Sequence, residues 1–199
     1  MRSTHQQAIL KYDDLRKEAR SIAQENLPKH LAPIKLDGIS SKALVSARLW
    51  DELNGRKVDW DWSFSSQYCS RYPKAFDLSV WHGNTLLSLT LGRPTFKGTS
   101  MRMDFIERQP SQTLFAGDLF SVSLLAYITY ARIIGAEYIR IINPMNEKLI
   151  NFYKIAREKA KETSKELFKP KPKDVEEELK KETILGSPEN LITPDNKSE

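Results

Sequence analysis

Asn146 and Tyr153 lie just beyond a strand-like run of residues, and both side chains carry groups that could take part in chemistry. The run is AEYIRIINP, residues 136–144, and a helical pattern follows it. A tyrosine hydroxyl can act as a general acid, and an asparagine amide can donate and accept hydrogen bonds. The same residue types are also common in turns and cores for purely structural reasons. The spacing therefore leaves two interpretations open: a cofactor site, and an ordinary boundary between a strand and a helix.

A second place for chemistry is the start of an apolar helix that we expect over residues 118–134. The free N–H groups and the dipole of a helix N-terminus favour an anion, and here they would belong to the stretch Phe115-Ala116-Gly117-Asp118-Leu119. Small Ala116 and Gly117 would let a ligand come close to the backbone. Asp118 is suited to capping the helix and would repel a phosphate if it pointed inward. A bound anion and a capped helix without a ligand both remain open.

Cysteine and histidine give no pattern that predicts a metal site or a disulfide. Cys69 is the one cysteine, and His5, His30 and His82 have no companions at the spacing of zinc ligands. The N-terminal MRSTHQQ has no apolar stretch, and no run approaches the roughly 18 apolar residues of a membrane span. We therefore expect a cytoplasmic protein with no metal and no membrane contact.

The net charge of +5 is uneven, since residues 1–156 carry +6 and the remainder carries −1. A mildly basic body suits a phosphorylated cofactor, and it is also typical of ordinary cytosolic proteins. Trp60, Trp62 and Trp81 could stack on a base or an aromatic substrate, although alternating aromatic residues are more typical of a core strand. Nucleic acid is not an expected partner, because the helix over residues 41–53 has no cluster of Arg and Lys.

The chain resembles the GCN5-related N-acetyltransferase (GNAT) superfamily over about residues 76–156. Asn146, Leu149 and Tyr153 match the family spacing N-x-x-(A/L)-x-x-x-Y, and GAEYIRII before them is similar to the family's fifth strand. A hairpin, a strand over residues 100–108 and a long apolar helix precede them in the family's order.

The resemblance implies where acyl-CoA would bind. In the family, the strands that match residues 100–108 and 137–142 splay apart, and acyl-CoA inserts between them. Its pantetheine arm hydrogen-bonds to the edge of the splayed strand, and its pyrophosphate rests on the loop that matches residues 114–119. The residues at the positions of Asn146 and Leu149 belong to this cofactor site, with the asparagine lining the pantetheine channel.

The resemblance also implies catalytic roles. Tyr153 would act as the general acid toward the departing CoA thiolate, and a carboxylate on the strand over residues 100–108 would take a proton from the attacking amine. Asp104 and Glu107 are the candidates for that carboxylate. In a regular strand they lie on opposite faces, so at most one would point into the cleft.

The sequence departs from the family pattern in two places. The family's phosphate loop is usually (Q/R)-x-x-G-x-(G/A), whereas this chain has FAGDLF, with one usable glycine. After the tyrosine the family continues with K-x-G-F and two more strands, whereas this chain has KIAR and a helical pattern.

Two functions therefore stay open. The first is a divergent GNAT-like N-acyltransferase that moves an acetyl group from acetyl-CoA to an amine, either a small molecule or a protein. The second is a catalytically degenerate GNAT-fold protein that binds or regulates a protein partner, for example through its charged C-terminal tail. A homodimer is compatible with both.

The spacing of apolar residues predicts the elements that would position these residues. We expect helices over residues 5–28, 41–53, 66–71 and 118–134, strands over residues 58–64, 100–108 and 136–144, and a hairpin turning at Gly83-Asn84. The strand–helix–strand unit around residues 118–134 predicts a parallel crossover.

The expected fold is an α/β (α+β layered) domain with a GNAT-like mixed central sheet and helices on both faces. It would span residues 1–156, with a helical N-terminal part over 1–56 and the sheet and two main helices over 57–156. A charged helical extension and a disordered tail would follow over residues 157–199.

Overall fold

The computed structural model describes residues 3–53, 55–58, 60–111 and 114–142. The chain divides into two units, Met1–Thr163 and Ser164–Glu199, and all described residues belong to the first. The candidate residues Asn146, Leu149 and Tyr153 lie outside the described residues, as does the expected extension over 157–199.

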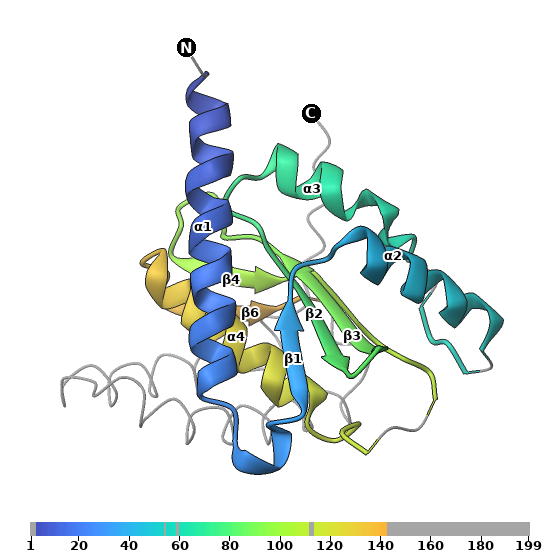
Figure 1. Cartoon of the computed structure of the whole chain (residues 1–199). Helices are drawn as coiled ribbons and strands as arrows, with labels where there is room; N and C mark the ends of the chain where they lie inside the picture. The colour runs from blue at the N-terminus through green and yellow to red at the C-terminus, as the bar shows by residue number, and fades with distance from the viewer. Residues whose placement is uncertain (1–2, 54, 59, 112–113, 143–199) are drawn as a thin grey trace, which may run out of the picture. The chain divides into compact units, whose positions relative to one another are not determined.

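Within the described residues, six strands form two hydrogen-bonded groups (Figure 1). The first is an antiparallel sheet in the order β1-β2-β3-β5, formed by Ile34–Asp37, Phe76–His82, Thr85–Gly92 and Phe105–Arg108. The second is a parallel pair of β4, Ser100–Met103, and β6, Tyr138–Ile141. An antiparallel bridge between Pro94 and Met101 connects the two groups, because β3 continues beside β4.

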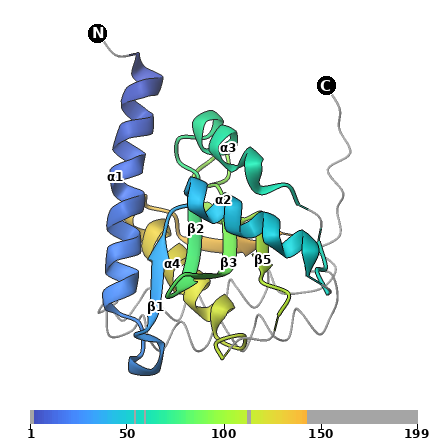
Figure 2. The ribbon, with the colours of Figure 1, turned by 45° about the vertical axis from the view of Figure 1, so that its right-hand side comes forward.

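Helices cover both faces of this sheet (Figures 1 and 2). One face carries α1, Thr4–Glu25, and α4, Leu119–Ile133, while the other carries α2, Ser41–Arg48, and α3, Ser65–Arg71. Three short 3-10 helices complete the described elements: η1 Lys29–Leu31, η2 Leu49–Glu52 and η3 Trp62–Phe64. The expectation of a mixed α/β fold of strands and helices is confirmed, and so is the parallel crossover through α4.

Local sequence explains where several elements begin and end. Ser3 and Gln6 form a reciprocal capping box at the start of α1. Gly83 and Gly135 have positive φ angles of 57° and 77°, which a glycine adopts without strain, and they form the hairpin turn and the end of α4. The predicted helix ends and the hairpin therefore follow from turn residues that the sequence shows directly.

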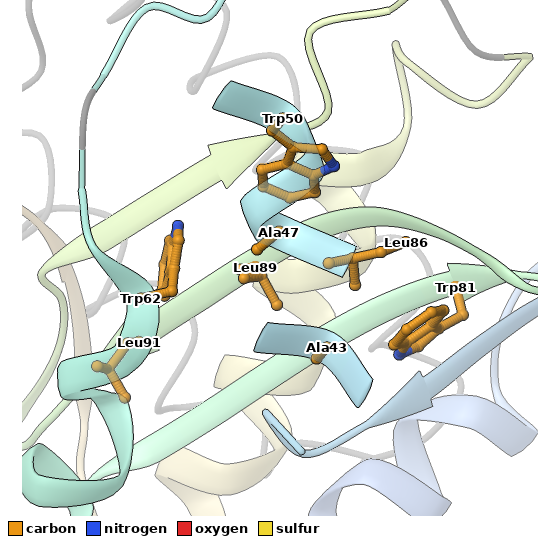
Figure 3. Packing of buried hydrophobic residues seen from close by; sticks show 8 residues of the cluster. All are labelled: Ala43, Ala47, Trp50, Trp62, Trp81, Leu86, Leu89 and Leu91. Atoms are coloured by element: carbon orange, nitrogen blue, oxygen red, sulfur yellow. The ribbon is translucent and has the colours of Figure 1, made fainter. Parts of the chain in front are cut away.

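The α2 side of the sheet is filled by a tryptophan-rich core (Figure 3). Its buried members are Ala43, Ala47, Trp50, Trp62, Trp81, Leu86, Leu89 and Leu91. On the opposite face, Phe76 of β2 stacks on Tyr130 of α4 with ring centroids 4.6 Å apart. The wide apolar surface of α4 is buried there, as its sequence predicts.

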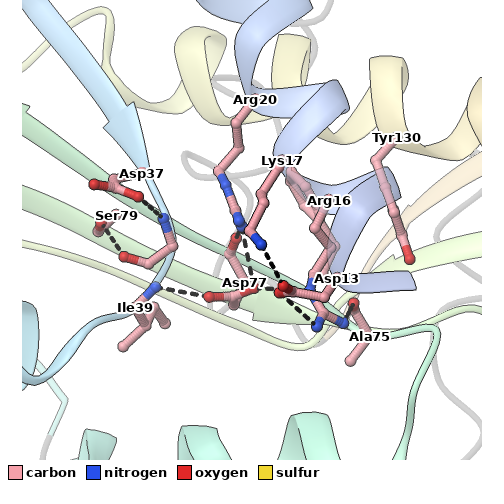
Figure 4. Close-up of polar contacts among 12 residues, drawn as sticks. Asp13, Arg16, Lys17, Arg20, Asp37, Ile39, Ala75, Asp77, Ser79 and Tyr130 are labelled. Carbon is pink, nitrogen blue, oxygen red and sulfur yellow. Dashed lines mark hydrogen bonds and ion pairs between the residues drawn. The ribbon is translucent and has the colours of Figure 1, made fainter. Parts of the chain in front are cut away.

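Buried charges attach α1 to the sheet (Figure 4). The Asp77 carboxylate lies 3.5 Å from Arg16 Nε and 3.2 Å from Arg20 Nη1, and it also accepts a hydrogen bond from the Ile39 N–H at 2.7 Å. Arg16 also donates to the carbonyl oxygen of Ala75 at 3.2 Å. The N-terminal helix is therefore part of this fold and is fixed by specific polar contacts as well as by packing.

The sequence pattern assigned one strand wrongly and missed another. The described residues of the stretch 58–64 do not form a strand, because the Asp61 side chain accepts a hydrogen bond from the Ser63 N–H and starts the 3-10 helix η3 instead. Strand β1 has no counterpart in the prediction, since its four residues are too short a signal. In the structure, the Gln24 amide stabilises β1 by pairing with the Ile34 carbonyl at 2.8 Å and the Leu36 N–H at 2.7 Å.

Candidate functional site

The strand predicted over residues 100–108 contains a β-bulge, which divides it into β4 and β5. Met101 lies opposite Pro94, whereas Phe105 lies opposite Leu91. The four residue steps from Met101 to Phe105 therefore lie opposite only three steps, from Pro94 to Leu91. One extra residue is inserted in this strand near Asp104. A bulge bends a strand and changes the direction of the side chains that follow it.

The bulge brings both candidate carboxylates to the same side of the sheet. Asp104 accepts a hydrogen bond from Tyr68, and Glu107 accepts one from Trp62; both donors belong to the aromatic cluster on the α2 and α3 side. The expectation that Asp104 and Glu107 lie on opposite faces is wrong, because it assumed a strand without an inserted residue.

The described part of the parallel pairing reaches this bulge. Strand β6 pairs with β4 as far as Met103 and Ile141, and the Ile142 N–H donates to the Met103 carbonyl oxygen at 3.2 Å. Beyond this point β5 pairs with β3 on one side, and no described residue pairs with its other edge. The Gln109 N–H donates to the Leu87 carbonyl oxygen, next to β3. Because successive N–H groups of a strand point to opposite edges, the N–H groups of Ile106 and Arg108 point away from β3.

Glu107 is buried in a dense set of polar contacts. Its side chain is 4 % exposed, and its carboxylate accepts hydrogen bonds from Arg56 Nε at 2.6 Å, Arg56 Nη2 at 3.2 Å and Trp62 Nε1 at 2.7 Å. Arg56 also donates to the Trp60 carbonyl oxygen at 2.8 Å and pairs with Asp51. This arrangement ties the segment before η3 to the sheet.

Asp104 is held in a similar way by two partners. It accepts a hydrogen bond from the Tyr68 hydroxyl at 2.6 Å and pairs with Arg102 Nη2 at 2.7 Å. Burial raises the pKa of Tyr68, and the hydrogen bond to Asp104 raises that pKa further, so this hydroxyl stays protonated as a donor. Both candidate bases would have to give up an ion pair before they could accept a proton.

Replacing Arg56 with methionine is expected to lower the free energy of unfolding by about 3 kcal/mol, because it leaves the Glu107 charge buried without its ionic partner. Urea unfolding followed by circular dichroism measures the change. The matched control is Asp51→Asn, which removes the 61 % exposed partner of Arg56 and should cost less than about 1 kcal/mol. Equal losses in the two variants would contradict a special role for the buried pair.

The stretch that resembles the family's phosphate loop forms a turn directly before α4. Leu119 N–H and Asp118 N–H both donate to the Phe115 carbonyl oxygen, at 3.1 and 2.8 Å. The Asp118 side chain makes no capping hydrogen bond to the helix, and its carboxylate lies 4.0 Å from His30 Nε2. A Cβ added at Gly117 would meet no atom within 4 Å, so the backbone at Gly117 can be approached closely. Capping by Asp118, one of the two sequence interpretations, does not occur.

Topology places this turn at the carboxyl end of β5. The chain leaves β5 at Arg108, forms the turn, and returns through α4 to β6, which runs parallel to β4. The N-terminus of α4 therefore lies toward the carboxyl ends of β4, β5 and β6. The structure therefore places the start of α4 at the carboxyl end of the strands, whereas the side chains of Asp104 and Glu107 lie on the face of the sheet that carries α2 and α3.

A pocket of about 340 Å³ lies between α2 and the segment that leads into η3. Arg48, Asp51, Arg56 and Asp61 line it together with Trp60 and Trp62. Sequence reasoning singled out the two tryptophans but missed the charged residues, because they come together only when residues 55–63 fold back beside α2. The alternation of Trp60 and Trp62 with Asp59 and Asp61 was the one sequence feature that could have indicated charged residues beside the tryptophans.

Within the part of the chain that the structure describes, no group of three or more His, Cys, Asp or Glu residues is placed to hold a metal ion. Among the same residues, no helix combines the length and the apolar character that crossing a bilayer requires. Comparisons with protein-family models, with curated proteins and with solved structures find no match to this chain.

Proposed function

We propose that the chain is a divergent GNAT-like N-acyltransferase that binds acetyl-CoA along the open edge of β5 and transfers the acetyl group to an amine. The observation that carries this proposal is the edge of β5 after the bulge, with which no described residue pairs. The backbone N–H groups of Ile106 and Arg108 are directed at this edge. A strand edge of this kind can pair with an extended amide-containing arm.

The turn before α4 supports the same proposal. Its N–H groups and the helix dipole would interact favourably with a pyrophosphate, and the open space around Gly117 would allow the close approach. Acetyl-CoA would supply the acetyl group as a thioester. From the resemblance, Tyr153 would protonate the departing thiolate, Asn146 would line the channel for the pantetheine arm, and Leu149 would belong to the same cofactor site.

A specific observation favours a second function, binding without catalysis. Asp104 and Glu107 both lie in ion pairs, with Arg102 and Arg56, and their oxygens accept further hydrogen bonds from Tyr68 and Trp62. A carboxylate engaged in this way has to break contacts before it can serve as a general base. The second candidate is therefore a catalytically degenerate protein that keeps the GNAT-like fold and acts through a protein partner.

Acetyl-CoA at millimolar concentration is expected to raise the melting temperature of the full chain, because a ligand that binds only the folded state stabilises it. Gly117→Ala should fold with an unchanged melting temperature, since its added methyl group meets no atom. In the presence of acetyl-CoA, the variant should bind about tenfold more weakly, a loss of roughly 1.4 kcal/mol of binding free energy. Calorimetric titration of both proteins measures the difference.

The absence of any acetyl-CoA binding by the unmodified chain would contradict the acyltransferase and favour the second candidate, and equal affinities of the two proteins would remove the turn from the site. If binding occurs, Tyr153→Phe separates the candidates. An acyltransferase should lose most of its turnover and keep its affinity, whereas a binding protein shows no turnover with either chain.

A further inference from the structure

The pocket beside α2 has a mixed set of charges on apolar walls. The indoles of Trp60 and Trp62 lie 6.0 Å apart at 77°, so they form two nearly perpendicular surfaces. Ala47 and Trp62 belong to the wall of this pocket and appear on neighbouring elements in Figure 3. Apolar walls with a few placed polar groups are the usual composition of a small-molecule site.

Arg56 is already committed within this pocket. Its guanidinium bonds to Glu107, to Asp51 and to the Trp60 carbonyl oxygen. A ligand that engaged Arg56 would have to displace one of these partners. Asp51 also lines the pocket and is paired with Arg56. The charged residues of the pocket outside this pair are Arg48, in the last turn of α2, and Asp61.

Asp61 is fixed in position and ionised. Its carboxylate accepts hydrogen bonds from the Ser63 N–H at 2.9 Å and the Ser63 hydroxyl at 2.7 Å. These bonds hold the pKa of Asp61 below its usual value, and the positive charge of Arg48 contributes in the same direction. In the described part of the chain no ion pair joins Arg48 to Asp61, although both line the pocket.

We infer that this pocket binds a zwitterion, an α-amino acid with an aromatic or large apolar side chain. The ligand carboxylate would pair with Arg48, its ammonium group would pair with Asp61, and its side chain would lie against Trp60 and Trp62. A purely cationic ligand would leave Arg48 without a partner, and a purely anionic one would face Asp61. A volume of about 340 Å³ suits a single amino acid better than a peptide, since it lies at the small end of ligand pockets.

Calorimetric titration of the full chain with L-phenylalanine, without acetyl-CoA, tests the inference. Two analogues provide the comparison: phenethylamine lacks the carboxylate, and 3-phenylpropanoate lacks the amine. Phenylalanine should bind at least about tenfold more tightly than either analogue, because each analogue leaves one charge of the pocket unpaired. Analogue affinities equal to that of phenylalanine, or no binding of phenylalanine, would overturn the inference.

Two substitutions test whether Arg48 binds the ligand carboxylate and whether Asp61 binds the ligand ammonium group. Arg48→Met should weaken phenylalanine binding about tenfold and leave phenethylamine binding unchanged, whereas Asp61→Asn should weaken the binding of both. Lys42→Met, a cation on the same helix that does not line the pocket, is the matched control and should bind phenylalanine normally. Both Arg48 and Asp61 are exposed, so neither substitution should prevent folding.

Unchanged phenylalanine binding in Arg48→Met and Asp61→Asn would contradict the assignment. The inference concerns binding alone and stands apart from acyl transfer. A chain that binds phenylalanine but not acetyl-CoA would overturn the proposed function and leave this pocket assigned.

Discussion

Replacing Gly92 with alanine should destabilise the protein by about 3 kcal/mol or more, and the variant can fail to fold at 37 °C. A Cβ at this position would lie 2.9 Å from the Arg102 carbonyl carbon and closer still to its oxygen. These are backbone atoms of β4, so no side chain can rotate to make room. The two strands would have to separate beside the bulge, where β4 also holds β6.

Gly117→Ala is the matched control for this substitution, because its added methyl group meets no atom within 4 Å. Both variants place the same group on a glycine, so any difference in their urea midpoints reports the local space. We expect Gly117→Ala to match the unmodified chain. If Gly92→Ala were equally stable, the close approach of β3 and β4 at the bulge would be wrong.

The second large effect is expected for Asp77→Asn, which should cost about 3–5 kcal/mol of unfolding free energy. This carboxylate lies between Arg16 and Arg20, whose side chains are 7 % and 9 % exposed (Figure 4). Asparagine keeps the shape but removes the charge, so two buried guanidinium groups lose the carboxylate that they share. The attachment of α1 to β2 should weaken most.

Asp13→Asn is the comparison for that experiment. Asp13 also pairs with Arg16, at 3.2 Å, but its side chain is 39 % exposed, and solvent screens the pair. We expect a loss of about 1 kcal/mol or less. Guanidinium unfolding would mask ion pairs by its own ionic strength, so urea is the better denaturant. Similar losses of unfolding free energy in Asp77→Asn and Asp13→Asn would show that burial does not make the ion pairs of Asp77 more stabilising than the exposed pair of Asp13.

Much of the fold could be predicted from local patterns. The hairpin follows from Gly83-Asn84 between two apolar runs, and α4 follows from a broad apolar stripe that ends at Gly135. Helix α1 was predicted from its apolar spacing, yet two arginines, Arg16 and Arg20, are among its buried residues. The sequence pattern assigns arginine to solvent, and only the position of Asp77 on β2 explains the burial.

The site could be predicted less well, because it depends on pairing between distant segments. The bulge near Asp104 follows from how residues 100–108 align with β3, and a single strand does not show that alignment. Glu107 has two partners that are distant in the sequence: Arg56 is 51 residues away and Trp62 is 45 residues away. The resemblance predicted two candidate bases, whereas their contacts show both in ion pairs.

The central claim, that acetyl-CoA pairs with the open edge of β5, is tested most directly by residue-resolved amide hydrogen exchange. Spectra are recorded with and without saturating acetyl-CoA. The amides of Ile106 and Arg108 should exchange at least about tenfold more slowly in the complex, because they would donate to the bound ligand. The Gln109 amide, which already donates to Leu87, serves as the internal reference. Binding of acetyl-CoA without slower exchange at Ile106 and Arg108 would contradict the claim.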